Sequence, residues 1–88
     1  MDTSIALISI ILEDVDSVVL LNSYLHEYGS YIIGRMGLPY QTQDRRINII
    51  SVAIDAPQDQ IAALSGKIGK LPGVSVKTAY SNIISHGV

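Results

Sequence analysis

Hydrophobic positions in the first third of the chain change from a continuous run to a helical period. Residues 4–13 are almost entirely Ile, Leu, Ala and Ser, which is typical of a central strand covered on both faces. In residues 15–28 apolar side chains recur at helical spacing, and Gly29 follows as a C-terminal stop. The pattern predicts a strand followed by a helix.

The next two apolar segments have the composition of strands. Residues 30–39 carry Tyr, Ile, Met and Leu together with Gly34 and Gly37, and glycines inside a strand indicate close approach by backbone, ligand or partner. A polar loop separates them from residues 47–55, which are rich in β-branched residues. We therefore expect these two strands to form a hairpin.

A second helix and a last strand complete the pattern. Residues 56–70 have apolar positions at helical spacing, with Asp55 as the expected cap and Pro57 in the first turn. Leu-Pro-Gly at 71–73 ends this helix, and residues 74–80 alternate between apolar and polar as a strand does.

The order of the elements is βαββαβ, which right-handed crossovers fold into one antiparallel sheet. We expect an α+β ferredoxin-like sandwich with four strands and both helices on one face. A chain of 88 residues has room for a single core, so residues 1–88 are expected to form one domain. The strands at 4–13 and 47–55 would lie at the centre.

Both faces of the central strands are apolar. The rows expected to face the helices and form the core are Ala6, Ile8, Ile10 and Leu12 with Ile50, Val52 and Ile54. The rows on the opposite face are Ile5, Leu7, Ser9 and Ile11 with Ile47, Ile49, Ser51 and Ala53. Burial of this second face against another subunit predicts a dimer or tetramer. The alternatives are a facing that is wrong by one residue, or an exposed face that the protein tolerates.

Composition and charge narrow the classes of partner. The chain is 48% hydrophobic with a mean hydropathy of +0.33, which supports a subunit contact. Its net charge is −2 and its six Lys and Arg residues are dispersed, so direct nucleic-acid binding is not expected.

The absence of cysteine excludes disulfides, iron–sulfur ligation and thiol catalysis, and makes a reducing cytoplasm the expected location. The apolar run at residues 5–12 lacks a basic start and is too short to cross a bilayer, so neither export nor membrane insertion is expected.

Neither metal binding nor catalysis has a clear set of residues. His26 and His86 stand apart, with no second histidine at ligand spacing, so an ordinary histidine is favoured over a metal ligand at His26. A site made by His26 from several subunits stays open. Glu13, Asp14 and Asp16 cluster without a nucleophile or base beside them, and helix capping explains them. We predict no catalytic residues and no enzymatic activity.

Two segments are candidates for ligand binding. The turn that carries Asp14, Asp16 and Ser17 presents backbone N–H groups at a helix start, where a small anion can dock. In the segment from Gly34 to Gly37, Arg35 stands between two glycines and can make a forked contact with a carboxylate. The competing interpretation of this segment is a β-bulge with an ion pair between subunits.

Several stretches in combination are recognisable. They are LHEYG at 25–29 running into YIIGRMGLPY at 31–40, NIIS at 48–51 with DAP at 55–57, and ALSGKIG at 63–69 with LPGV at 71–74. Together they resemble the family of regulators of the iron-only hydrogenase system, over nearly the whole chain. That family is ACT-like and similar to the ligand-binding domain of the nickel-responsive repressor.

The resemblance implies a cytoplasmic ACT-like regulator associated with hydrogenase maturation, without assigned catalytic residues. Two departures bear on its effector. Amino-acid-binding ACT domains have a glycine near the start of the first helix, where this chain has residues 14–17 as Asp-Val-Asp-Ser. Nickel ligation in the repressor uses a cysteine, which this chain lacks. Serine-like amino acids and nickel are therefore not favoured as effectors, and no cofactor is predicted.

The functional hypothesis is a ligand-sensing module whose effector binds at a cleft between subunits, formed by the turn at 13–17 and the strand at 34–37. One alternative is a structural adaptor that senses no effector, and another is a metal-responsive corepressor. Any action on DNA would require a partner protein, because the chain has no basic recognition helix.

Overall fold

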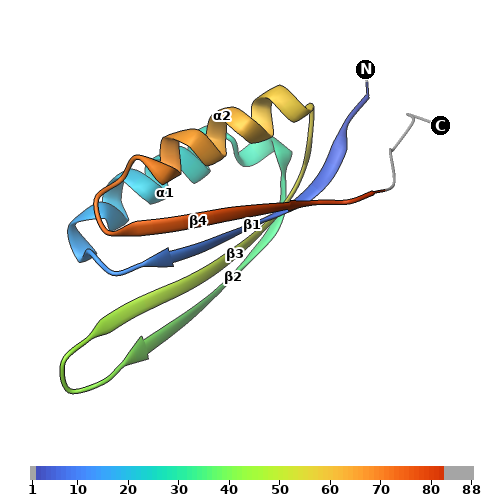
Figure 1. Ribbon diagram of the computed structural model, residues 1–88. Helices are drawn as coiled ribbons and strands as arrows, with labels where there is room; N and C mark the ends of the chain where they lie inside the picture. Colours follow the sequence, from blue (N-terminus) through green and yellow to red (C-terminus); the bar gives the residue numbers. More distant parts are fainter. Residues whose placement is uncertain (1, 83–88) are drawn as a thin grey trace.

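The computed structural model describes residues 2–82 and has the expected α+β fold (Figure 1). Four strands form one antiparallel sheet in the order β2-β3-β1-β4, and α1 and α2 lie together on one of its faces. The elements are β1 (Ser4–Leu12), η1 (Val15–Ser17), α1 (Val18–Glu27), η2 (Gly29–Tyr31), β2 (Ile32–Gln41), β3 (Arg46–Ala56), α2 (Gln58–Gly69) and β4 (Val74–Tyr80).

Element boundaries differ from the expected ones where short 3₁₀ turns intervene. The helix expected over residues 15–28 begins as the turn η1, because Ser17 N–H bonds to the Asp14 carbonyl three residues back at 3.0 Å. The turn η2 likewise delays β2, which starts at Ile32 and not at residue 30. Asp55 does not cap α2, since it lies inside β3 and Pro57 occupies the capping position. The ends of β1, β3 and α2 shift by one or two residues.

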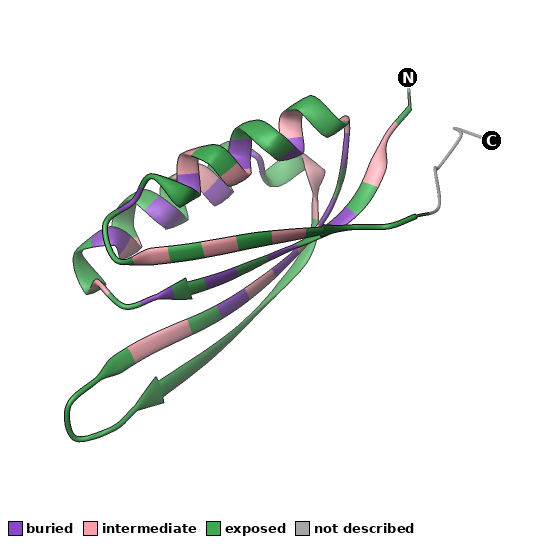
Figure 2. Ribbon diagram, in the orientation of Figure 1, coloured by how far each residue is buried: buried purple, intermediate pink, exposed green. Residues whose placement is uncertain are grey.

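The core lies between the helices and one face of the two central strands (Figure 2). The register pairs Ile10 with Ile50 and Ile8 with Val52, so the inner rows of β1 and β3 meet side by side. The expected core rows are confirmed, and the helices cover them with Leu21 and Leu25 of α1 and Ile61, Leu64 and Ile68 of α2.

A lysine on α2 joins the two helices. Lys67 Nζ lies 2.9 Å from Glu27 Oε2 of α1, and it stands 5.7 Å and 5.2 Å from the ring centroids of Tyr24 and Tyr28. The hydrogen bond to the Glu27 carboxylate is the main cause that raises the pKa of Lys67, against a smaller opposing effect of desolvation. The contact links α1 and α2 at the exposed surface of the helix layer.

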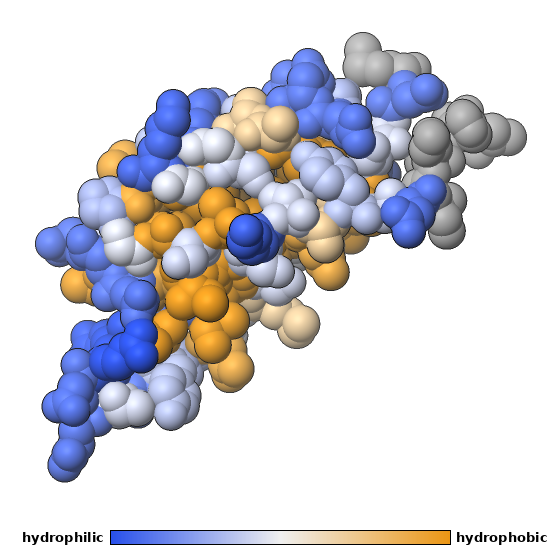
Figure 3. Space-filling model, viewed as in Figure 1, coloured by the Kyte–Doolittle hydropathy of each residue, from blue (hydrophilic) through white to orange (hydrophobic). Residues whose placement is uncertain are grey.

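The other face of the sheet has no helix over it. We call it the open face, and its large apolar side chains remain 42–48% exposed on β1 and β3 (Ile5, Leu7, Ile11 and Ile49). The outward facing expected for these rows is therefore confirmed, which removes the alternative of a one-residue error. Figure 3 shows hydrophobic side chains gathered over the middle of the molecule, while hydrophilic ones cover the tip of the β2–β3 hairpin.

The edge strand β2 enlarges the open face. Met36 pairs with Ser51, Leu38 with Ile49 and Tyr40 with Ile47 across the β2–β3 ladder, so the three side chains continue the rows of β3. They are 75%, 64% and 55% exposed. This apolar extension was not expected from the sequence, and it makes the open face larger than β1 and β3 alone provide.

A substitution in the core tests the assigned facing. Ile10→Ala removes a fully buried side chain between sheet and helices and should lower the free energy of unfolding by about 2–4 kcal/mol. Val19→Ala, at a position 77% exposed on α1, should change it by less than about 0.5 kcal/mol. Urea unfolding followed by circular dichroism, at one protein concentration, measures both. Equal losses for the two variants would contradict the packing described.

Candidate functional site

The polar groups of the turn between β1 and α1 form hydrogen bonds within the protein. Asp14 Oδ1 accepts a hydrogen bond from the Asp16 N–H at 2.9 Å, which caps η1. Ser17, only 3% exposed, donates through Oγ to the Pro72 carbonyl at 2.7 Å. These bonds occupy the Asp14 carboxylate, the Asp16 N–H and the Ser17 hydroxyl.

This turn also packs against the turn that precedes β4. Glu13 N–H bonds to the Gly73 carbonyl at 2.8 Å, and Gly73 has a φ of +67°. A Cβ on Gly73 would stand 2.5 Å from the Asp14 Cβ, so only glycine fits this contact. The two turns hold the ends of β1 and α2 together.

The segment from Gly34 to Gly37 is divided between the two faces of the sheet. Its pairing with β3 is shifted by a β-bulge at Ile33, after which Arg35 pairs with Val52 and Gly37 with Ile50, on the helix side. Gly34 pairs with Ala53 and belongs to the open face, where it borders a shallow depression. A Cβ on either glycine would meet nothing within 4 Å, so no close approach inside the subunit explains them.

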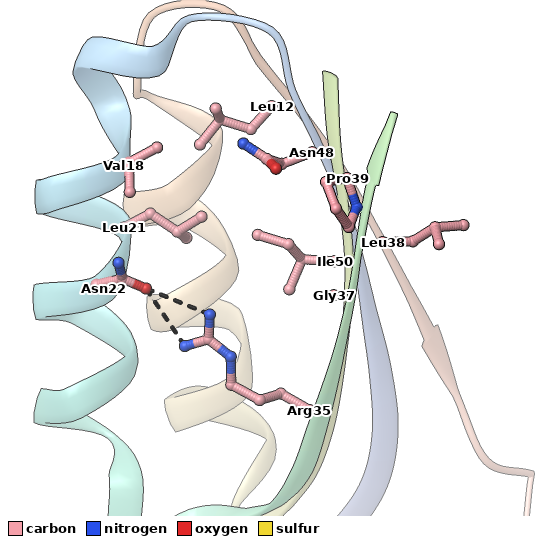
Figure 4. A pocket seen from close by; sticks show the side chains of 10 residues that line it. All are labelled: Leu12, Val18, Leu21, Asn22, Arg35, Gly37, Leu38, Pro39, Asn48 and Ile50. Carbon is pink, nitrogen blue, oxygen red and sulfur yellow. Dashed lines mark hydrogen bonds between the residues drawn. The ribbon is translucent and has the colours of Figure 1, made fainter. Parts of the chain in front are cut away.

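The helix side of β2 borders a cleft against α1, which we call the α1–β2 cleft (Figure 4). It has a volume of about 280 Å³. Its lining is mixed: apolar side chains come from Leu12, Val18, Leu21 and Ile50, the stretch of β2 from Gly37 to Pro39 borders it, and its polar side chains are Asn22, Arg35 and Asn48. A concave site in which a few polar groups converge beside apolar ones is the usual form of a small-molecule site.

Arg35 reaches across the mouth of the cleft to α1. Its Nη1 and Nη2 both donate to the same oxygen, Oδ1 of Asn22, at 3.3 Å (Figure 4). Within the described part of the chain the guanidinium has no carboxylate partner, because the ion pairs there are Glu13–Arg45 and Glu27–Lys67. A full positive charge is therefore held at the cleft by one neutral acceptor.

Asn48 supplies a second polar group. It lies on the inner side of β3 and is half-buried, and Figure 4 shows its amide turned into the space beside Leu12 and Val18. Its side chain makes no hydrogen bond to any described residue. The cleft thus has a cation at one end, a free amide at the other and apolar walls between them.

The structure brings together only part of the site expected from the sequence. Arg35 and Gly37 line the α1–β2 cleft, whereas Gly34 faces the other side of the sheet. Asp14, Asp16 and Ser17 are not among the residues that line the cleft. Sequence reasoning missed Asn22 and Asn48. The signal available for Asn48 was its place in the inward row of β3, next to Ile50, where an amide is unusual.

The described residues 2–82 contain no group of three His, Cys, Asp or Glu side chains that could hold a metal ion. His26 is exposed on α1, and His86 lies outside the described residues. Over the same part of the chain, no helix is long and apolar enough to cross a bilayer.

The sheet order and the two helices on one face are those of a ferredoxin-like α+β domain. A family model described as "TM1266-like: Iron-only hydrogenase system regulator, putative" matches residues 4–78. The chain belongs to this family, which confirms the resemblance seen in the sequence. A search of curated proteins finds no match to this chain.

Three solved structures illustrate the likeness. The uncharacterized protein TM1266 from Thermotoga maritima is 32% identical, with a TM-score of 0.77, 89% of this chain and 96% of that chain covered. A formyltetrahydrofolate deformylase from Pseudomonas putida is 16% identical with a TM-score of 0.60, and the match covers 90% of this chain but 29% of that enzyme.

The third structure is CPII, a nitrogen regulatory PII-like protein from Thiomonas intermedia, bound to ADP, AMP and bicarbonate. It is 15% identical with a TM-score of 0.51 and coverages of 94% and 93%. At these low identities, the second and third structures show a shared fold alone.

The contact between the two turns gives a sharp test. Gly73→Ala forces a Cβ into the backbone of Asp14 at a residue with positive φ, and should lower the free energy of unfolding by about 2–3 kcal/mol. Gly66→Ala is the matched control, since its Cβ meets nothing within 4 Å inside α2 and should stabilise by about 0.5–1 kcal/mol. Thermal and urea unfolding measure both. An unchanged Gly73→Ala variant would mean that the turns do not pack as described.

Proposed function

We propose that this chain is the ligand-sensing module of a regulator of the iron-only hydrogenase system. It binds a small anionic effector in the α1–β2 cleft, works as a homo-oligomer joined through the open face, and catalyses no reaction itself. Its output passes to a partner protein, in the cytoplasm that a chain without cysteine favours. Membership of a family described as a regulator supports the regulatory role.

The observation that carries the sensing role is the state of Arg35. Its guanidinium lies at a cleft of about 280 Å³ and bonds there to one neutral oxygen at 3.3 Å. Charge-assisted bonds from arginine to an anion are shorter and about twice as strong as neutral ones. Arg35 is exposed, so an anion in the cleft replaces both the Asn22 contact and water at the guanidinium, and the stronger bonds supply the free energy of binding only by their excess over these.

The open face supports the oligomer, and a second copy of this chain is the occupant we propose. With strands about 4.8 Å apart and residues about 3.3 Å apart, its projected area is on the order of 500 Å². Rough side chains add accessible area, so its size is comparable to the about 800 Å² that each partner of a standard interface buries. Four strands of one sheet can cover the same four strands of another.

Charge on the open face also suits a second copy. The central strands contribute aliphatic side chains and the hydroxyls of Ser9 and Ser51 to the middle of the face, and Asp55 stands opposite Ile5 at the end of β3. Lys77 is on β4, at the edge of the sheet, where a long side chain can keep its ammonium in water. Two copies can meet over the middle of the face if Asp55 and Lys77 stay at its rim, in water.

Strand β2 connects the two sites. Arg35 and Gly37 border the cleft on its helix side, and Met36 lies on the open face. Leu38 borders the cleft and also a depression of the open face. A ligand that displaces β2 would therefore alter the surface offered to the partner subunit, as a sensor requires. The open face alone would also suit a structural adaptor, which is the second candidate function.

The assembly is tested by its dissociation. The wild type should be a dimer or tetramer by light scattering at micromolar concentration, and Leu7→Asp or Ile49→Asp should weaken the assembly at least tenfold, because each puts a charge on the open face. The helical circular dichroism should persist in both. Ile10→Asp or Val52→Asp should instead unfold the subunit.

Ala62→Asp is the matched control for these changes, since it adds the same charge on the exposed side of α2. Its assembly should equal that of the wild type. A wild-type monomer, or an assembly unaffected at Leu7 and Ile49, would contradict the proposed interface.

The sensing role is tested by a thermal-shift screen of carboxylates, nucleotides and divalent metal ions, because a ligand of the folded state raises the melting temperature. We expect a hit whose shift is lost in Arg35→Ala and reduced in Arg35→Lys, which keeps the charge but loses the planar fork. Arg46→Lys, on the hairpin end of β3 and outside the cleft, is the control and should respond as the wild type does.

The outcome separates sensor from adaptor. If no compound shifts the melting temperature, or every shift persists in Arg35→Ala, the sensing role is wrong. Loss of assembly in Arg35→Ala without any ligand would make Arg35 an assembly contact of an adaptor.

A further inference from the structure

The two polar ends of the α1–β2 cleft define the chemistry of its ligand. From them we propose that the cleft binds a short aliphatic monocarboxylate that carries a hydrogen-bonding group at its far end. The carboxylate lies on Arg35, the chain crosses the floor of the cleft, and the far group meets Asn48. This inference rests on the proposed function and adds the class of the effector.

The carboxylate end follows from the geometry of the existing bond. Both terminal nitrogens of Arg35 converge on one oxygen of Asn22, at 3.3 Å each. A planar guanidinium presents two parallel donors, and the two oxygens of a carboxylate match them with bonds of about 2.7–2.9 Å. The neutral amide of Asn22 therefore holds the fork in place for an anion that satisfies it better.

The choice of carboxylate over phosphate rests on charge. Arg35 is the one charged side chain that lines the cleft among the residues described. A phosphate dianion would bring about two charges against this single cation. Its second charge would find no cation in the cleft. A carboxylate leaves no such deficit.

The far end of the ligand follows from Asn48. A volume of about 280 Å³ is at the lower end of the range of about 300–1,000 Å³ for drug-sized ligands, which suits a small molecule. Leu21 and Ile50, 1% and 8% exposed, close the floor of the cleft. The unpartnered amide of Asn48 can both donate and accept, so a terminal hydroxyl should bind better than a methyl group.

The test compares matched probes with the full-length protein. They are butyrate, its neutral isostere butyramide, 4-hydroxybutyrate, inorganic phosphate and AMP, each titrated while backbone amide shifts are followed by NMR. We expect butyrate to shift residues of α1 and β2, butyramide to bind at least tenfold more weakly, and 4-hydroxybutyrate to bind severalfold more tightly than butyrate.

Three variants test which residue binds each end of the ligand. Arg35→Lys should weaken both carboxylates at least tenfold. Asn48→Leu, which keeps the branched shape but removes both polar groups, should remove the preference for 4-hydroxybutyrate and leave butyrate binding. Arg46→Lys should bind all probes as the wild type does. Unchanged amide spectra without ligand show that each variant is folded.

The results separate this inference from the proposed function. If butyrate and butyramide bind alike, if phosphate binds more tightly than the carboxylates, or if no carboxylate binds, the assignment of class is wrong. If AMP or another screened anion then binds in a manner that depends on Arg35, the sensing function stands without it. If no compound in either set binds, both proposals fail.

Discussion

The antiparallel register between β1 and β3 is the constraint on which the other features depend. It sets Ile8 opposite Val52 and Ile10 opposite Ile50, so one face of the sheet becomes a continuous aliphatic surface that the helices cover. Because side chains alternate along a strand, the same register places Leu7, Ile11 and Ile49 on the other face. The stability of the subunit and its uncovered surface therefore have one origin. A shift of one residue would exchange the two faces.

The pairing of β2 with β3, together with the bulge at Ile33, decides which face of the sheet each side chain of β2 points to. The extra residue between the pairs of Ile32 and Gly34 decides which following side chains turn toward α1 and which turn away. Arg35 is brought to the helix side, where Asn22 meets it, and Met36 is sent to the open face. Since β2 is an edge strand, its outer backbone is not fixed by a second neighbouring strand. These features make it the element best placed to link a ligand in the cleft to a change in assembly.

The turns at the end of the sheet near the start of α1 have a different role from the cleft. Ser17 and Gly73 use buried and close contacts to bind the β1–α1 turn to the α2–β4 turn, and Asp14 completes the cap. The turn is consolidated by these hydrogen bonds, whereas the polar groups of the α1–β2 cleft include Arg35 without a carboxylate partner and Asn48 without a hydrogen bond among the described residues.

The sequence by itself determined the order of the elements, the inward rows of β1 and β3 and the family, because periodicity and local motifs are properties of neighbouring residues. It also pointed to Arg35 through the two glycines around it. It could not determine which of Gly34 and Arg35 faces the helices, since the bulge at Ile33 depends on pairing with β3. It could not place Asn22 beside Arg35 or leave Asn48 without a partner, because those facts arise from the packing of α1 over the sheet. Local pattern fixes what each segment becomes, and only contacts between distant segments decide which polar groups remain free to bind.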